Sequence, residues 1–137
     1  MDAVLTFIGH IETPYRTREE CPRNVEPDGP LCSVVVKKEF SDGLLGLESG
    51  RHILLLYWFE GVDRSRLRQH SRKKGIYAGV FALRAPSRPN PIAAAVVKIE
   101  KIENETITVK GLDCVSGTPL LDIKIAMDGE IVSEGPA

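Results

Sequence analysis

Hydrophobic residues along the chain fall into short runs separated by Gly, Pro, Asp and Asn, a pattern typical of β-strands joined by turns. We expect strands over residues 4–11, 33–40, 53–59, 77–84 and 105–112. In the last of these, Ile107 and Val109 alternate with polar residues, which indicates one solvent-exposed face. The run ILLLYWF at 53–59 does not alternate, and it predicts a strand covered on both faces, with its aromatic side chains in the core. Residues 43–50 predict one helical turn.

Residues 90–103 (NPIAAAVVKIEKIE) fit two different structures. Asn90 could cap a helix with Pro91 at its first position, because the apolar residues that follow recur at helical spacing. Alternatively, a strand begins at Ile92 and the chain turns at 103–105 into the strand over 105–112, forming a hairpin. Since most other segments are predicted as strands, an all-β barrel or sandwich is the simplest architecture.

Length, charge and cysteine content narrow the class of protein. The 137 residues suffice for one domain with an ordinary hydrophobic core. A net charge of -1 gives no overall field that would attract nucleic acid or an anionic membrane. The three cysteines lack metal-ligand spacing, so we expect a reducing compartment, no metal site and Cys114 as a small core residue. With no signal sequence and no apolar run long enough to span a bilayer, we expect a cytoplasmic protein without a membrane partner.

The first candidate site is the stretch RAPSRPNP at 84–91, which holds Arg84, Ser87, Arg88 and Asn90. Each proline fixes its own backbone and biases the preceding residue toward an extended conformation. Such a loop presents side chains and carbonyl groups with little ordering entropy left to lose on binding. A rigid, merely solvated surface loop is the alternative, but this density of Arg, Asn and Pro favours a ligand site.

The second candidate site is GLDCVSGTPLLDIK at 111–124, in which SGTP predicts a turn. It contains Asp113, Ser116 and Thr118, and strand alternation then places Asp122 and Lys124 together on a polar face. Two interpretations of that pair stay open. It is either a surface ion pair worth little, or Asp122 is a carboxylate beside apolar surface that faces a cation or an amine.

These motifs resemble the signature of a known family. The segments GVFALRAPSRPNPIAAAVVKI (79–99) and VKGLDCVSGTPLLDIK (109–124), together with IGHIETPY (8–15) and HILLLYWFE (52–60), are similar to the TrmO family, also called YaeB-like or TsaA-like. The resemblance implies an antiparallel β-barrel of about seven strands with short helical segments, formed by residues 1–137 as a short single-domain member. It therefore favours a strand over 92–102. It also implies an S-adenosylmethionine-dependent methyltransferase, usually a homodimer, that acts on the exocyclic amine of threonylcarbamoyladenosine beside the tRNA anticodon.

The resemblance further implies which residues form the site. Methyl transfer is an in-line displacement, so most of its catalysis is positioning. We hypothesise that Asp122 or Asn90 orients the accepting amine, and Tyr15 matches an aromatic residue that lies near the site, so these three are the expected catalytic residues. The residues expected to bind the cofactor are Arg84, Arg88, Pro89, Asn90, Pro91, Ile92, Asp113, Thr118, Leu120, Leu121, Asp122 and Lys124, with Pro119 in the same motif.

An RNA partner is suggested by residues 64–74 (RSRLRQHSRKK), which hold seven basic side chains when His70 is counted. This basic segment is either a solvated connection or a grip on tRNA phosphates, whose affinity would fall steeply with salt. Residues 83–85 and 93–95 depart from the family pattern. A second function therefore stays open, namely an S-adenosylmethionine-binding methyltransferase or regulator that acts on a small molecule or a protein.

Overall fold

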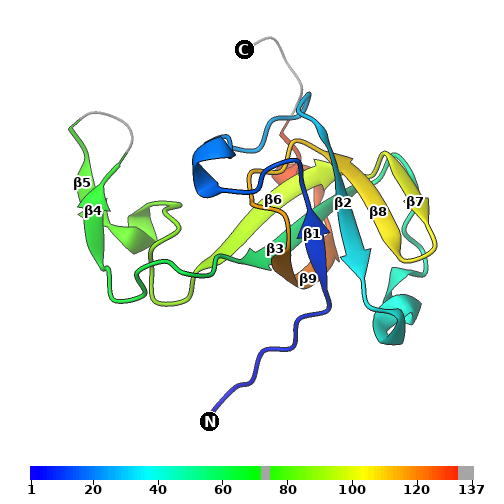
Figure 1. Cartoon of the computed structure of the whole chain (residues 1–137), viewed down its shortest axis with the longest axis horizontal. Coiled ribbons are helices and arrows are strands. Elements are labelled where there is room, and N and C mark those ends of the chain that lie inside the picture. Colours follow the sequence, from blue (N-terminus) through cyan, green and yellow to red (C-terminus); the bar gives the residue numbers. More distant parts are fainter. Residues whose placement is uncertain (72–74, 133–137) are drawn as a thin grey trace.

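A computed structural model describes residues 1–71 and 75–132, and within them regular structure is almost entirely β (Figure 1). The strands are β1 (Gly9–Glu12), β2 (Leu31–Val36), β3 (His52–Trp58), β4 (Arg68–His70), β5 (Tyr77–Gly79), β6 (Ile92–Lys98), β7 (Lys101–Glu103), β8 (Thr106–Lys110) and β9 (Thr118–Ile125). Four short 3-10 helices accompany them: η1 (Arg18–Glu20), η2 (Lys38–Leu44), η3 (Val80–Ala82) and η4 (Asp128–Glu130). The all-β prediction is confirmed. None of the helices in the described ranges is long and apolar enough to cross a bilayer.

Seven strands form one antiparallel sheet in the order β6-β3-β9-β1-β2-β8-β7. The two edge strands, β6 and β7, are consecutive in the chain and are joined by a bend at Ile99 and Glu100, so the sheet curls back on itself. Within the described residues no hydrogen-bonded ladder links β6 to β7, so the sheet remains open and the expected barrel is not fully closed. Strands β4 and β5 pair separately and, with η3, form an arm that projects from the sheet (Figure 1).

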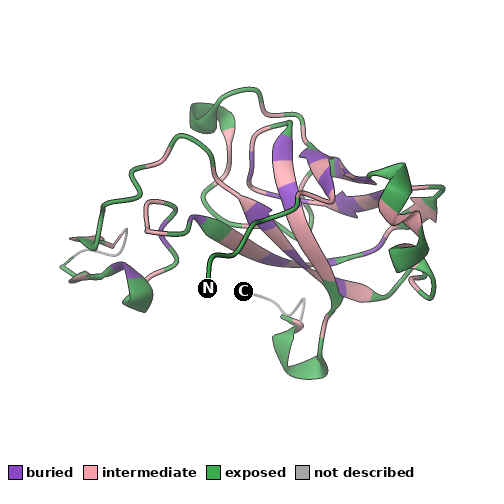
Figure 2. Cartoon of the chain, turned by 90° about the horizontal axis from the view of Figure 1, so that it is seen from below, coloured by how far each residue is buried: buried purple, intermediate pink, exposed green. Residues whose placement is uncertain are grey.

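The core lies inside the curled sheet, where buried residues alternate with more exposed ones along β1, β2, β3 and β8 (Figure 2). In β8, Ile107 and Val109 are fully buried, which confirms the predicted alternation, and Cys114 is buried as expected. In β3 the prediction of two covered faces is wrong, because Tyr57 and every second residue before it are buried while the residues between them are only half-buried. One curled sheet encloses one core, so the outer face of a central strand keeps partial contact with solvent.

Several strands are shorter than the apolar pattern predicts, because each strand extends only as far as its pairing with a neighbouring strand. The pairing of β1 runs from Gly9, so residues 4–8 lie outside the strand. Strand β2 ends at Val36, and η2 over Lys38–Leu44 replaces both the end of the expected strand and the helical turn expected at 43–50. Strand β5 ends at Gly79, opposite the first residue of its short partner β4, and η3 follows it.

The segment 92–102 is extended, so the strand interpretation is confirmed against the helix, but it is broken into two strands. Residues up to Lys98 pair with β3, and Lys101–Glu103 pair with β8 through the predicted hairpin. Between them Gly50 donates a backbone hydrogen bond to the Ile99 carbonyl at 2.8 Å. The chain changes partner at this point, which a single-strand prediction could not anticipate. Asn104 takes a positive φ of 54° in the hairpin turn.

Candidate functional site

The segments that follow β1 and β3 and those that precede β6 and β9 meet at one end of the sheet. The strand register requires this arrangement, because Trp58 lies opposite Ile92 and Ile11 lies opposite Thr118. We call residues 84–91 the proline loop, residues 111–117 the glycine loop and this edge of the molecule the loop end. Both candidate motifs from the sequence therefore come together at the loop end, with the exception of the residues farther along β9.

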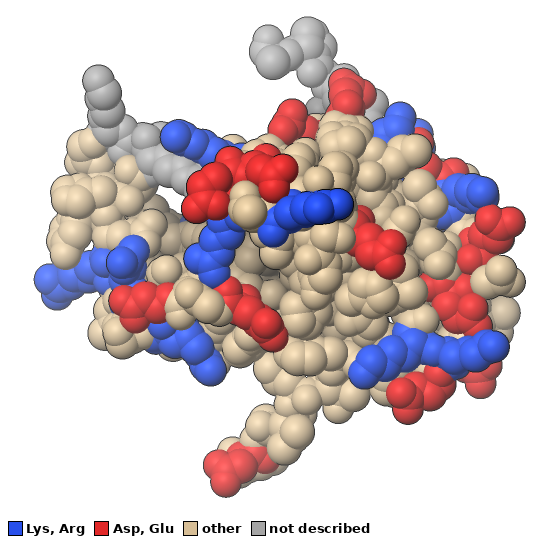
Figure 3. All heavy atoms as spheres, viewed as in Figure 1, with Lys and Arg blue, Asp and Glu red and all other residues tan. Residues whose placement is uncertain are grey.

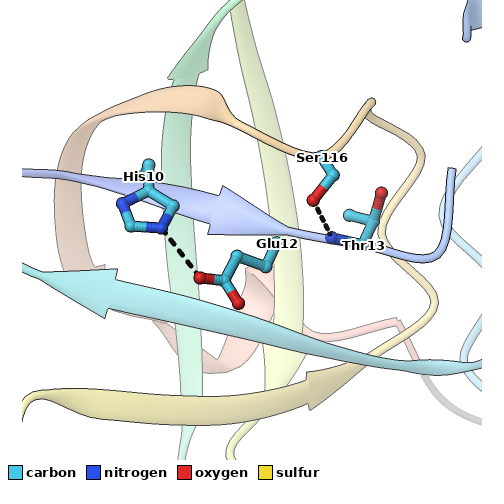
Figure 4. A network of polar contacts seen from close by, with 4 residues as sticks. All are labelled: His10, Glu12, Thr13 and Ser116. Atoms are coloured by element: carbon cyan, nitrogen blue, oxygen red, sulfur yellow. Dashed lines mark hydrogen bonds and ion pairs between the residues drawn. The ribbon is translucent and has the colours of Figure 1, made fainter. Parts of the chain in front are cut away.

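Hydrogen bonds join the N-terminal motif, residues 8–15, to the glycine loop (Figure 4). The Thr13 backbone amide donates to Ser116 Oγ at 3.2 Å, and the Thr13 hydroxyl donates to the Cys114 carbonyl at 2.7 Å. The Ser116 amide in turn donates to the Tyr15 carbonyl at 2.8 Å. Tyr15 is thus held beside the glycine loop, and partial burial, with the nearby Glu26 carboxylate, raises its pKa, so the phenol stays protonated at neutral pH.

A buried tyrosine fixes the carboxylate of the glycine loop. The Tyr57 hydroxyl donates to Asp113 Oδ1 at 2.7 Å, and Tyr57 is only 1 % exposed. Burial and the adjacent carboxylate both raise the pKa of Tyr57 far above its usual value, so this phenol is a permanent donor. Arg84 lies close enough to affect the same hydroxyl electrostatically. The loop end therefore contains a half-buried carboxylate in one orientation with a guanidinium nearby.

The three cysteines are free thiols. Burial raises the pKa of Cys21 and Cys32, and it raises the pKa of Cys114 to about 12, so none of them is a ready thiolate at neutral pH. Among the residues with defined placement, no group of three or more His, Cys, Asp or Glu side chains is arranged to hold a metal ion.

Arg88 shapes the proline loop from within. Its half-buried guanidinium donates to three backbone carbonyls, those of Leu83 at 3.2 Å, Ala85 at 3.0 Å and Val80 at 3.0 Å. Prolines supply no N–H groups, so carbonyls in such a loop need side-chain donors or water. Arg88 thus determines the path of the loop, and a cofactor at this position would be met by the backbone that Arg88 arranges.

Other contacts tie the proline loop to the sheet. Arg84 donates to the Ala94 carbonyl of β6 at 2.9 Å. The Phe59 amide donates to the carbonyl of the buried Pro91 at 2.9 Å, directly after β3. Asn90 lies between these anchors and is exposed, as is Ile92, which begins β6. The loop therefore presents the Asn90 side chain outward from a fixed backbone.

One arginine of the basic segment also contacts the proline loop. Arg64 Nε donates to the Pro89 carbonyl at 2.8 Å, and its Nη2 donates to Asn90 Oδ1 at 3.4 Å. The guanidinium carbon lies 5.1 Å from the centre of the Trp58 ring. By contrast, Arg66 Nη1 donates to Gln69 Oε1 at 3.4 Å. The predicted members Arg72, Lys73 and Lys74 lie outside the described residues.

Asp122 lies away from the proline loop. It is opposite Leu56 in the middle of β3, whereas Asn90 precedes the residue opposite Trp58 at the end of that strand. Its Oδ2 is 2.9 Å from Lys124 Nζ, and both side chains are about half exposed, which matches the surface-pair interpretation. The register therefore places Asp122 two positions along β3 from the residue that pairs with Ile92. Asp122 lines a hollow of about 470 Å³ near η2, whose apolar wall includes Ile8, Phe40, Leu44, Leu47 and Ile123.

The remaining expected residues of β9 point in different directions. Thr118 is buried, and its hydroxyl donates to the Val115 carbonyl at 2.6 Å, closing the turn before the strand. Leu120 is fully buried in the core, whereas Leu121 is half-buried at a bulge opposite β3. These residues shape the start of β9 more than they present surface to a ligand.

Sequence reasoning missed two residues of the loop end, Tyr57 and Arg64. Tyr57 was expected to be only a core residue, although a buried tyrosine usually has a hydrogen-bond partner, and that rule is the one available signal. Arg64 was one charge in a run of charges, and nothing in the sequence distinguishes it from Arg66.

The fold and the loop end together define the class: an all-β protein with a curled antiparallel sheet, a proline-rich loop and a fixed carboxylate at the same end of the sheet. The chain belongs to the TrmO family, since residues 10–128 match the family described as the tRNA-methyltransferase O N-terminal domain.

Individual relatives agree with this assignment. A probable S-adenosyl-L-methionine-binding protein, VirR of Rhizobium radiobacter, is 42% identical over 123 residues, covering 90% of this chain and 70% of that protein. A Homo sapiens tRNA (adenine(37)-N6)-methyltransferase is 32% identical, over 85% of this chain but 28% of the longer protein. The crystal structure of TrmO from Pseudomonas aeruginosa superposes with a TM-score of 0.77 at 29% identity, over 99% of this chain and 61% of that one.

Proposed function

We propose that this protein is an S-adenosylmethionine-dependent methyltransferase that modifies the exocyclic amine of threonylcarbamoyladenosine beside the tRNA anticodon. The observation that carries the proposal is the family match over residues 10–128, supported by a human relative named for methylation of tRNA adenine. The name of the VirR relative supports the cofactor. We expect the enzyme to act in the cytoplasm.

We assign the cofactor to the loop end, and the chemistry of the groups there fits it. S-Adenosylmethionine supplies an electrophilic methyl group on a positively charged sulfur. The half-buried Asp113 carboxylate, held by Tyr57, can balance a positive charge, and the carbonyls arranged by Arg88 can accept hydrogen bonds. Because burial weakens screening by water, this carboxylate has a stronger effect than an exposed one would.

Asn90 is the residue best placed to orient the accepting amine. It is exposed on a backbone fixed from both sides, and its amide oxygen can accept an N–H of the amine. Tyr15, whose backbone carbonyl is hydrogen-bonded to the glycine loop, adds a protonated phenol. Their contribution is chiefly positioning, which accounts for a large share of catalysis in a displacement reaction.

We propose that the protein acts as a homodimer formed through the arm. Apolar side chains on and next to the arm are exposed in the single chain, among them Leu67 at 59 %, Tyr77 at 57 % and Phe81 at 80 %. Exposed apolar side chains grouped on a projecting element are typical of association surfaces. Sedimentation of the purified protein should give twice the mass of one chain, and a Phe81→Glu variant should lower it to one. A monomeric wild-type protein would contradict this proposal.

The function is tested by incubating the protein with labelled S-adenosylmethionine and tRNA that carries, or lacks, threonylcarbamoyladenosine. We expect label only in the modified tRNA, and mass spectrometry of the digested nucleosides should place the methyl group on the exocyclic amine. The name of the VirR relative leaves a second candidate, an S-adenosylmethionine-binding protein with a different acceptor. An unchanged tRNA nucleoside profile in a deletion strain, together with no transfer in vitro, would favour that candidate.

A further inference from the structure

We infer that Arg64 is a positioning residue of the proposed methyltransferase: it clamps the proline loop and sets the orientation of the Asn90 amide. The inference rests on the proposed function and extends it to the basic segment. It assigns to one arginine a role that differs from contact with tRNA phosphates. It also joins the start of that segment physically to the group that we expect to orient the amine.

Arg64 supplies the proline loop with donors from outside. Pro86, Pro89 and Pro91 have no backbone N–H, so carbonyls of this loop pair with side-chain donors or water more often than with backbone donors. Arg88 provides donors from inside the loop, as described above. Arg64 provides the second set from outside, with Nε 2.8 Å from the Pro89 carbonyl.

The guanidinium is itself held in place by Trp58. Its carbon lies 5.1 Å from the ring centre, within the range of a cation–π contact. Trp58 is the last residue of β3 and contacts Phe7, with ring centres 6.4 Å apart. Contact with Trp58 on β3 therefore fixes the position of the Arg64 guanidinium relative to the sheet, although Arg64 is an exposed residue.

The contact with Asn90 selects one of the two amide orientations. Arg64 Nη2 donates to Oδ1 at 3.4 Å, and a flipped amide would place N–H groups against N–H groups. An amide oxygen has two lone pairs, so one remains to accept an N–H from an amine. Loss of Arg64 would therefore let the amide turn its donors toward the amine and weaken its orientation.

The decisive variant is Arg64→Lys, because lysine keeps the charge but lacks the planar fork that makes two directed hydrogen bonds and stacks on a ring. Arg66 offers a matched control in the same basic segment, since its guanidinium donates to Gln69 at 3.4 Å. We expect Arg64→Lys to lower kcat about tenfold, because a small misplacement of a reacting group is costly, with the tRNA KM within about twofold of the wild type. Arg66→Lys should leave both constants unchanged.

Salt dependence separates positioning from phosphate contact. If Arg64 only bound phosphate, Arg64→Lys would behave like the wild type, and Arg64→Ala and Arg66→Ala would raise KM and reduce the salt dependence equally. That result would overturn the inference. A double-mutant cycle adds a second test: in an Asn90→Ala background, Arg64→Lys should have little further effect on kcat, and an unchanged tenfold loss would contradict action through Asn90.

A measurement that needs no activity keeps the two proposals distinguishable. The Ile92 amide donates to the Asn90 carbonyl at 2.7 Å, and the Phe59 amide donates to Pro91 at 2.9 Å. Hydrogen exchange at both amides should be faster in Arg64→Lys than in the wild type, and unchanged in Arg66→Lys. If the wild type transfers no methyl group but these rates differ as expected, the proposed function fails and the clamp stands. Equal exchange rates in all three proteins would refute the clamp.

Discussion

Replacement of Asn90 by alanine should lower turnover about 100-fold, the size of effect typical for loss of one positioned group in proton-transfer or amine chemistry. Asn90 is exposed, and the backbone around it is held by contacts of Phe59, Arg84 and Arg88 that do not involve its side chain. We therefore expect the fold and the affinity for S-adenosylmethionine to change little. Single-turnover methyl transfer to modified tRNA measures the effect directly.

The matched comparison is Asp122→Asn, the other residue that the sequence suggests for the amine. Asp122 is ion-paired with Lys124 and lies along β9 away from the proline loop, so we expect a loss of less than about tenfold. A larger loss in Asp122→Asn than in Asn90→Ala would transfer the orienting role to Asp122. Full turnover in both folded variants would remove both residues from the catalytic site.

The largest effect on stability is expected for Gly111→Ala, at the start of the glycine loop. Gly111 has a φ of +76°, and an added Cβ would lie 1.5 Å from the backbone oxygen of Glu26. The Glu26 amide donates to the Gly111 carbonyl at 2.9 Å, so the two segments cannot separate without losing that bond. We expect the free energy of unfolding to fall by about 4 kcal/mol or more, through backbone strain and overpacking together.

Two other glycines provide controls for this prediction. Gly43 has no heavy atom near an added Cβ and no positive φ, so Gly43→Ala should stay within about 0.5 kcal/mol of the wild type. Gly46 has a φ of +97° but open space, so Gly46→Ala should cost about 1 kcal/mol from conformation alone. Urea unfolding followed by circular dichroism gives all three values. If Gly111→Ala were no less stable than Gly46→Ala, the claim that the Glu26 backbone leaves no room for a Cβ at position 111 would be wrong.

Local side-chain polarity was enough to predict most of the strands. The alternation over 105–112 and the hairpin turn before it are local features, because burial on one face of a strand is decided by every second residue. The ends of the strands were harder to predict. Strand β5 extends only as far as its pairing with β4, and the extended segment from Ile92 breaks where it changes partner from β3 to β8, so both limits depend on the partner strand and not on the segment's own side chains.

The candidate site was predicted in its parts but not in its connections. The proline loop and Asp113 are marked by unusual local composition and lie together at the loop end, as the motifs suggested. The bond from Tyr57 to Asp113 spans 56 positions and that from Arg64 to Pro89 spans 25, so no local pattern reports them. The local pattern also misplaces Asp122. Its motif suggests a position at the loop end, whereas its pairing with Leu56 places it farther along β9.

The distribution of surface charge supports RNA binding by the basic segment less strongly than its sequence does. Positive and negative side chains are interspersed over the face drawn in Figure 3, although Lys and Arg side chains also lie toward the arm. Arg64, Arg66 and Arg68 are all exposed, but the Arg64 guanidinium donates to the proline loop. An RNA contact through this segment would therefore have fewer basic side chains available to bind phosphates than the sequence of residues 64–74 suggests.

The most direct test of the account is calorimetric titration of the folded protein with S-adenosylmethionine, in the absence and presence of tRNA. We expect one site per chain with micromolar affinity, about -8 kcal/mol, and weaker binding in Asp113→Asn. Absence of binding in both conditions, by a protein whose circular dichroism shows it to be folded, would contradict the assignment of a cofactor site to the loop end.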